Sequence, residues 1–272
     1  MRKSSKSFAV GVAFCFASGL VSGAPVDLST WTAESYPAVS GFNAGVWTVA
    51  SGGGSVFQSV NGQPTFFVSD FNAFGTKVTG KIKPGSGDDD YIGFALGFLP
   101  NDSTNTGADY LLVDWKQGTQ TFDFGAPSTS PGGVAQDGLA VSRVTGKPDA
   151  DEFWQHANLS GTPAGSGLNE LARGITLGST GWVDNVEYEF TFDFGPNDLE
   201  VFVNGVKQID ITGSFANGRI AFYNFSQAAV TYSAFTKDAG SFPPPTGNVP
   251  EPATLALLSL GLAGLGFSRR KQ

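Results

Sequence analysis

Cysteine is almost absent from the sequence. The single cysteine, Cys15, lies close to the N-terminus, so the chain that follows has no partner for a disulfide and no thiol for catalysis or metal binding. Its stability has to come from a buried core, which a chain of about 200 residues can form without covalent cross-links. Disulfide frameworks, zinc–thiolate sites and cysteine nucleophiles are therefore excluded for this part of the chain.

Basic residues are scarce as well. The 272 residues include 16 Lys and Arg against 24 Asp and Glu. Six of the basic residues lie near the two ends, namely Arg2, Lys3, Lys6, Arg269, Arg270 and Lys271. The rest of the chain thus has ten basic residues against 24 acidic ones, a net charge of about −14. Such a surface repels phosphate backbones, and we expect no nucleic-acid partner.

The N-terminal segment has the features of a secretory signal peptide. A basic start is followed by an apolar run over residues 8–20 and by small residues over 21–24. We predict cleavage after Gly23, because a cut one residue later would place Pro25 at the first mature position, which signal peptidases tolerate poorly. The alternative is a buried N-terminal helix or strand.

The C-terminal segment combines a linker, a short apolar run and a basic end. Residues 241–248 are rich in Pro and Gly, which predicts an extended linker. Pro250, Glu251 and Pro252 then precede an apolar run over 253–267. About 15 residues at ~1.5 Å each span only ~22 Å, short of a ~30 Å hydrocarbon core. The run is a marginal anchor, whose basic end would stay on the cytoplasmic side.

This combination resembles the PEP-CTERM protein-sorting signal over residues 249–272. The resemblance implies export across the inner membrane of a Gram-negative bacterium that makes extracellular polysaccharide. It also implies transient membrane insertion of the tail, processing by an exosortase, and delivery to the cell surface or the medium. Pro250, Glu251 and Pro252 would be the elements that the exosortase recognises. An ordinary C-terminal membrane anchor is the alternative.

The body of the chain has the pattern of an antiparallel β-sandwich. Charged residues make up only 15%, whereas Gly (37) and Phe (24) are numerous, which is typical of short strands joined by tight turns. Aromatic residues alternate with polar ones over 188–194, as on a strand with one buried face. Asn204-Gly205 separates two strand-like runs and predicts a type I′ hairpin. Further strands are predicted over 76–82, 91–99, 110–115, 219–226 and 230–235.

Two of these segments, 88–98 and 110–121, closely resemble the C-terminal lectin-like domain of thrombospondins. Similar segments follow in the same order at 138–141, 153–156, 180–184 and 217–227. The resemblance spans about residues 74–235 and implies an all-β, two-sheet jelly-roll sandwich of the concanavalin A-like lectin/glucanase type. The chain lacks the cysteines of that domain, so the receptor biology of thrombospondins is not carried over.

Asp88, Asp89 and Asp90 form the densest carboxylate cluster, in a turn that leads into a strand. Their mutual repulsion would be relieved by Ca²⁺, whose ligands are oxygens, and the resemblance adds that the thrombospondin domain binds calcium. Asp114 and Asp109 on the next strand are further candidate ligands. The alternative is a solvated acidic turn, because successive strand residues point to opposite faces and at most two of the three carboxylates easily meet one ion.

Aromatic residues are the candidates for contact with a sugar. Trp115, Trp154 and Trp182 match tryptophans of the thrombospondin domain, and we consider stacking on a sugar ring by Trp154 and Trp182. Packing in the core is the competing interpretation for all three.

Catalysis has little support in the sequence. A retaining glucanase needs two carboxyl groups about 5 Å apart. Glu187 and Glu189 alternate, but they fall on the polar side of their strand. His156 is the only histidine, and no nucleophile motif accompanies it.

The sequence therefore predicts four segments: a signal peptide over 1–23, a sandwich over 24–240, a linker over 241–248 and a sorting signal over 249–272. The leading hypothesis is a non-enzymatic surface or matrix protein whose sandwich binds extracellular polysaccharide or another surface protein. A glucanase-like hydrolase on the same fold and a passive coat component are the alternatives.

Overall fold

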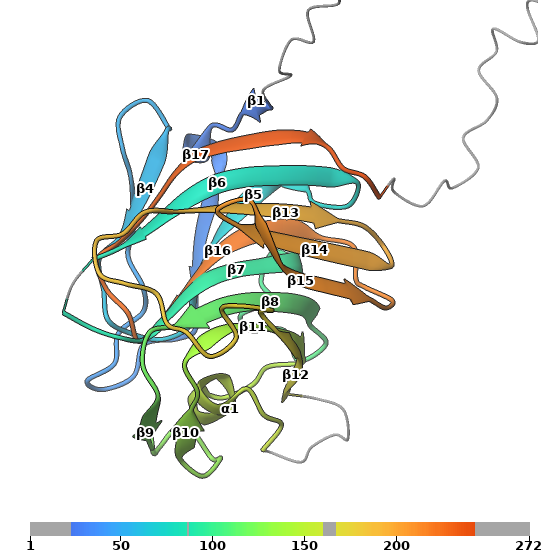
Figure 1. The fold of residues 1–272 in the computed structure, drawn as a ribbon. Coiled ribbons are helices and arrows are strands. Elements are labelled where there is room, and N and C mark those ends of the chain that lie inside the picture. The colour runs from blue at the N-terminus through green and yellow to red at the C-terminus, as the bar shows by residue number, and fades with distance from the viewer. Residues whose placement is uncertain (1–22, 86, 160–166, 243–272) are drawn as a thin grey trace, which may run out of the picture.

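The computed structural model describes residues 23–242 apart from 86 and 160–166 (Figure 1). Residues 1–22 of the predicted signal peptide, residues 243–248 of the linker and the whole sorting segment lie outside these residues. The described chain forms two antiparallel sheets, a separate two-stranded hairpin and one short helix. Across these same residues, no helix has the length and apolar character needed to cross a membrane.

The first sheet has the central order β15-β14-β13-β6-β17-β4-β3. Its strands are β15 (Val206–Thr212), β14 (Asp198–Val203), β13 (Tyr188–Phe194), β6 (Thr76–Pro84), β17 (Val230–Ala239), β4 (Ser55–Gln58) and β3 (Trp47–Val49), and the short β1 (Ala24–Pro25) pairs with β17. All pairs are antiparallel, as the sequence predicted.

The second sheet has the order β12-β11-β8-β7-β16-β5-β2. Its strands are β12 (Gly167–Arg173), β11 (Gly138–Thr145), β8 (Asp109–Lys116), β7 (Tyr91–Phe98), β16 (Arg219–Phe225), β5 (Thr65–Asn72) and β2 (Thr32–Ser35). The remaining elements are a 3-10 turn η1 (Leu28–Thr30), the hairpin of β9 (Gln120–Phe122) and β10 (Gly133–Ala135), and α1 (Ala150–Gln155).

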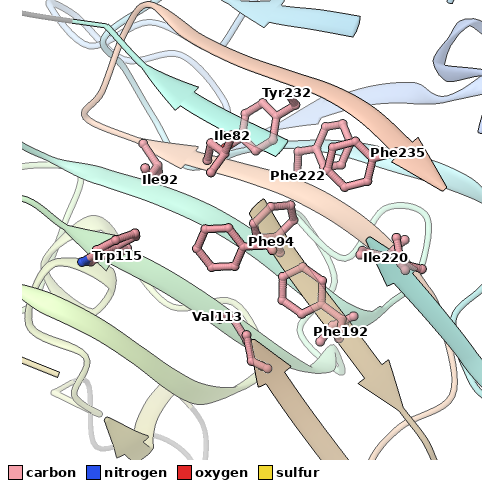
Figure 2. Close-up of a cluster of buried hydrophobic side chains, with 14 of the residues drawn as sticks. Ile82, Ile92, Phe94, Val113, Trp115, Phe192, Ile220, Phe222, Tyr232 and Phe235 are labelled. Carbon is pink, nitrogen blue, oxygen red and sulfur yellow. The ribbon is translucent and has the colours of Figure 1, made fainter. Parts of the chain in front are cut away.

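Between the two sheets lies an aromatic core. Figure 2 shows Phe94 of the second sheet facing Phe192 of the first, with Phe222 and Phe235 close by. The ring centroid of Phe94 lies 4.6 Å from that of Phe192 and 5.9 Å from that of Phe222. Such offset and edge contacts are favourable for aromatic pairs and add to the burial of their area. The alternation predicted over 188–194 is confirmed, since its aromatic side faces this core.

The predicted hairpin is also confirmed. Asn204 and Gly205 have φ values of 50° and 75°, and Val203 pairs with Val206 across the turn. Positive φ at both central positions is what a type I′ turn requires. The other predicted strands appear within a few residues of their expected bounds, except that the last one extends to Ala239.

A second aromatic cluster, which the sequence analysis did not predict, covers the outer face of the second sheet, the face turned away from the first sheet. Tyr91, Tyr223 and Phe225 point outward from its strands and pack against Phe153 and Trp154. In Figure 1, α1 lies next to β11 and β12, and the β9–β10 hairpin lies beside α1. We call α1, this hairpin and the loops around them the covering layer.

The covering layer explains why β7 and β8 are buried on both faces. Every residue of β7 is buried, as are seven of the eight in β8. Helix α1 begins at a capping box, in which Asp149 accepts from the Glu152 N–H and Glu152 accepts from the Asp149 N–H. The covering layer holds the candidate site described next.

Candidate functional site

The acidic turn, Asp88 to Asp90, joins β6 to β7 at the edge of the covering layer. One carboxylate oxygen from each residue can lie within 4.8 Å of the others. Asp88 accepts hydrogen bonds from the Asp89 N–H, at 3.1 Å, and from the side chain of Asn61. Burial raises the pKa of Asp88 to about 6, and the charge of Asp90 adds to the shift. The structure thus brings these three predicted ligands together.

A buried lysine lies beneath the acidic turn. Lys116 Nζ is 2.5 Å from Asp90 Oδ1, and both side chains are almost completely enclosed. The same ammonium group is 3.2 Å from the carbonyl oxygen of Asp89 and 4.4 Å from the centroid of the Trp154 ring. Burial nevertheless raises the pKa of Asp90, against the effect of Lys116. The protein therefore carries an internal cation that neutralises part of the turn.

A cavity of about 440 Å³ opens beside the acidic turn, and we call it the acidic-turn cavity. Its polar lining includes Asp88, Asp90, Asn61 and Gln120. Its apolar lining consists of Phe42, Phe122, Phe124 and Trp154. The Phe122 side chain is the most accessible of these rings, because the residue is 46% exposed. This volume falls in the range of ligand pockets, which combine apolar walls with a few polar groups.

A second cavity of about 380 Å³ adjoins the first, and we call it the proline-lined cavity. Pro37, Pro127 and Pro148 contribute to its walls, together with Tyr36 and Lys147. The two cavities share Ser40, Phe42 and Phe124 as common lining residues. These shared residues place the two cavities next to each other.

The tryptophans considered for stacking are buried. Trp182 is 1% exposed within the core between the sheets, where its indole N–H donates to the carbonyl oxygens of Asp90 and Trp115. It presents no ring face to a ligand, which corrects the sequence interpretation. Trp154 is equally buried, but it does line the acidic-turn cavity. The accessible ring at this site, Phe122, was not singled out by the sequence analysis.

Asp114 lies apart from the acidic turn, in a buried charge network. Its carboxylate is 3.0 Å from His156 Nε2, and His156 Nδ1 is 3.3 Å from Glu170. Arg173 binds Glu170 in turn, at 2.9 Å. The other candidate partner, Asp109, forms two hydrogen bonds with Arg143. Neither aspartate joins the three carboxylates of the turn, because each is engaged elsewhere, which corrects their assignment as its additional ligands.

The alternating glutamates face solvent, as the sequence predicted. Glu189 is exposed on β13, and Glu187 forms a surface ion pair with Lys81 at 2.6 Å. Neither lines the two cavities described above. Among the residues that the structure describes, three carboxylates come together in the acidic turn instead.

These features define an antiparallel jelly-roll sandwich of the lectin-like class, with one sheet covered by an additional layer. Residues 43–239 match the model of the thrombospondin C-terminal region. Because this match covers more than half of the chain, the protein belongs to that family. Residues 248–271 match the PEP-CTERM protein-sorting motif, which marks the chain as exported and sorted to the cell surface through its C-terminal tail.

Several solved structures are similar to the chain at low identity. A carbohydrate-binding module, CBM66, from Bacillus subtilis is 10% identical, with 71% of this chain and 91% of that one covered and a TM-score of 0.46. A protein of unknown function with a galectin-like fold, from the same organism, is 10% identical over 80% and 96%, with a TM-score of 0.47. The lumenal domain of VIP36, in its Ca²⁺- and mannose-bound form, is 12% identical over 78% and 84%, with a TM-score of 0.44. No curated protein sequence matches the chain.

The buried histidine predicts a specific loss of stability at alkaline pH. Burial opposes the charged form of His156, but Asp114 and Glu170 outweigh it and raise the pKa to about 9. An unfolded histidine has a pKa of about 6.5. The network should therefore stabilise the fold fully below about pH 6.5 and lose this contribution as the pH rises through 9.

Substituting His156→Asn should flatten this decline. Asparagine tolerates the left-handed backbone of His156, whose φ is 51°, so the substitution removes the charge without adding backbone strain. Urea unfolding of both proteins between pH 6 and 10 measures the effect. Equal pH slopes for the wild type and the variant would contradict the protonated network.

Proposed function

We propose that the protein is a non-catalytic surface protein that binds extracellular polysaccharide in the acidic-turn cavity. The observation that carries the proposal is the composition of this cavity. It sets an accessible aromatic ring, Phe122, beside the carboxylate of Asp88 and the amides of Asn61 and Gln120.

This combination suits a sugar. The C–H faces of a pyranose are apolar and pack on an aromatic ring, whereas its hydroxyl groups need both donors and acceptors. Asp88 offers acceptors, and the two amides offer both kinds of group. The PEP-CTERM motif supports an extracellular ligand, because it directs the chain to the cell surface.

Hydrolysis of a polysaccharide is the second candidate function. Asp88 and Asp90 lie in one cavity with carboxylate oxygens within 4.8 Å, and the pKa of Asp88 is about 6. These are features of the acid and nucleophile of a retaining glycosidase. Binding is favoured because Asp90 is only 4% exposed and one of its oxygens is held by Lys116. A nucleophile in that position is not free to reach a sugar carbon.

The proposal predicts that Phe122→Ala weakens polysaccharide binding by about tenfold or more, because the sugar loses its apolar wall. The matched control is Phe57→Ala, which removes another partly exposed phenylalanine from β4 of the first sheet. Affinity electrophoresis of residues 24–248 in gels containing the host's extracellular polysaccharide measures binding. The release of reducing ends in the same mixtures separates the two functions.

Retention by the wild type without reducing ends supports binding, and reducing ends that disappear in Asp88→Asn support hydrolysis instead. If the wild type is not retained, or if the two phenylalanine variants are weakened equally, binding at this cavity is ruled out.

Calcium is the cofactor expected at the acidic turn. The donor set fits a hard cation, since it consists of carboxylate oxygens within reach of one another, and a bound ion would relieve the repulsion that adds to the effect of burial on the Asp88 pKa. Asp88 and Asp89 would be the principal ligands, with the Asp90 oxygen that Lys116 leaves free.

Removing calcium should therefore lower the melting temperature. A cation that binds only the folded chain stabilises it by about 2.7 kcal/mol at a hundredfold excess over Kd, which corresponds to roughly 5–10 °C for a domain of this size. The double variant Asp88→Asn, Asp89→Asn should abolish the difference between calcium and chelator. Asp90 is left intact because its loss would leave Lys116 without its partner.

The matched control for the calcium experiment is Asp70→Asn, which alters an exposed aspartate of β5 outside the acidic turn. The control should melt like the wild type in both conditions. A melting curve that responds neither to chelator nor to the double substitution would rule out a calcium site at the acidic turn.

An exosortase is the expected processing partner. The short apolar run after Pro252 is a marginal anchor, and Glu251 stands just outside it, where a membrane enzyme can reach it. In a host with an exosortase, the mature protein should lack the segment that follows Pro250-Glu251-Pro252. Glu251→Ala, or a host without the enzyme, should leave the full-length form in the membrane. Intact-mass measurement of the exported protein decides this, because a mature form that retains residues 255–272 would contradict processing.

A further inference from the structure

We propose that the proline-lined cavity is a second sugar subsite, which takes a carboxylate-bearing residue of the polysaccharide and uses Lys147 as its cation. This inference rests on the proposed function and specifies its ligand. The polysaccharide would be a mixed chain, with a neutral sugar at the acidic turn and an acidic sugar beside Lys147.

The proline-lined cavity is well suited to hold a ligand without rearrangement. Pro37, Pro127 and Pro148 have fixed φ angles, so its walls lose little conformational freedom when a ligand binds. Tyr36 and Phe42 add aromatic surface to the lining. The cavity therefore offers a second preformed, largely apolar recess next to the first.

The two cavities adjoin at an aromatic wall. The rings of Phe42 and Phe124 lie 5.2 Å apart between their centroids, and both residues line both cavities. A ligand that occupies both recesses has to pass over this wall. A single sugar cannot do so, whereas an extended chain with one residue in each recess can.

Charge distinguishes the two recesses. The acidic-turn cavity offers no net positive charge to a carboxylate, because Lys116 offsets Asp90, and Asp88 and Asp89 would offset the two charges of a calcium ion, so this cavity favours a neutral sugar. The proline-lined cavity contains Lys147, whose Nζ lies 5.6 Å from the centroid of the Tyr36 ring. Within 23–242, leaving aside 86 and 160–166, no ion pair involves this lysine.

The one acidic residue in the proline-lined cavity is already engaged by the backbone. Asp149 accepts hydrogen bonds from the N–H groups of Thr129, Ser130 and Glu152, at 3.0–3.1 Å. Burial opposes ionisation of Asp149, but the hydrogen bonds around it outweigh this effect and lower its pKa. Its carboxylate is thus stabilised by backbone donors and does not depend on Lys147, which remains as the cation of this cavity available to a ligand.

The acidic net charge of the protein is compatible with a polysaccharide that contains both neutral and acidic sugars. At physiological salt, charges beyond about 8 Å are largely screened, so Lys147 can attract one carboxylate although the surface as a whole is acidic. A polysaccharide with a carboxylate on every residue would instead place one in the acidic-turn cavity, where Lys116 is already paired with Asp90.

The test uses the host's extracellular polysaccharide before and after chemical reduction of its carboxyl groups to alcohols. The wild type should bind the untreated polymer about tenfold more tightly than the reduced one, as expected for a hydrogen bond between charged groups. The Lys147→Gln variant should bind the untreated and the reduced polymer equally. Its affinity for the reduced polymer should match that of the wild type. The matched control, Lys83→Gln, removes an exposed lysine from β6 and should keep the preference.

The possible results test the acidic subsite at Lys147 and the proposed polysaccharide binding separately. If Lys147→Gln keeps the wild-type preference, or if the wild type binds both polymers equally, the acidic subsite is overturned while polysaccharide binding stands. If the wild type binds neither polymer, the proposed function itself is overturned. Thermal melting of Lys147→Gln, expected to match the wild type, shows that lost preference does not reflect lost folding.

Discussion

Two charged residues on β8 determine how the outer face of the second sheet is built. Asp114 and Lys116 alternate with apolar residues on a strand that is buried on both faces. A buried charge without a partner costs about 3–5 kcal/mol, so each needs a counter-charge from another segment. The acidic turn supplies Asp90 to Lys116, and the residue that ends α1, His156, pairs with Asp114. The acidic turn and the covering layer are thereby each fixed to β8.

The candidate site is a consequence of this attachment. The Lys116 ammonium group holds Asp90 on one side and lies over the Trp154 ring on the other, which joins the acidic turn to the helix of the covering layer. Phe122 and Phe124 pack against each other, with ring centroids 4.7 Å apart, and close the same cavity from the β9 side. Both recesses thus lie on the covering layer, and the sandwich beneath supplies a rigid base.

The sequence predicted those parts of the fold that depend on local pattern. Alternation over 188–194 and the Asn204-Gly205 pair each report on one strand and its nearest partner, and both were correct. The covering layer was missed because a continuous apolar run, such as that of β7, does not indicate what covers each face. Its capping box, Asp149 to Glu152, was visible in the sequence and could have revealed α1. Local patterns could not reveal Asp90 as the partner of Lys116 or His156 as the partner of Asp114. These pairs form only through strand pairing and packing between segments far apart in the sequence.

The acidic turn could serve acid catalysis or calcium binding, and the pairing of Asp90 with Lys116 bears on the choice between them. As an acid catalyst, Asp88 would have to carry a proton, and its pKa of about 6 would allow this in part of the population near neutral pH. As a calcium ligand it must be ionised, because a proton and a cation compete for the same oxygens. The two uses of Asp88 therefore exclude each other at any one moment. Lys116 occupies one oxygen of the second carboxylate, Asp90, in either case, which leaves binding as the use that requires no change in the structure.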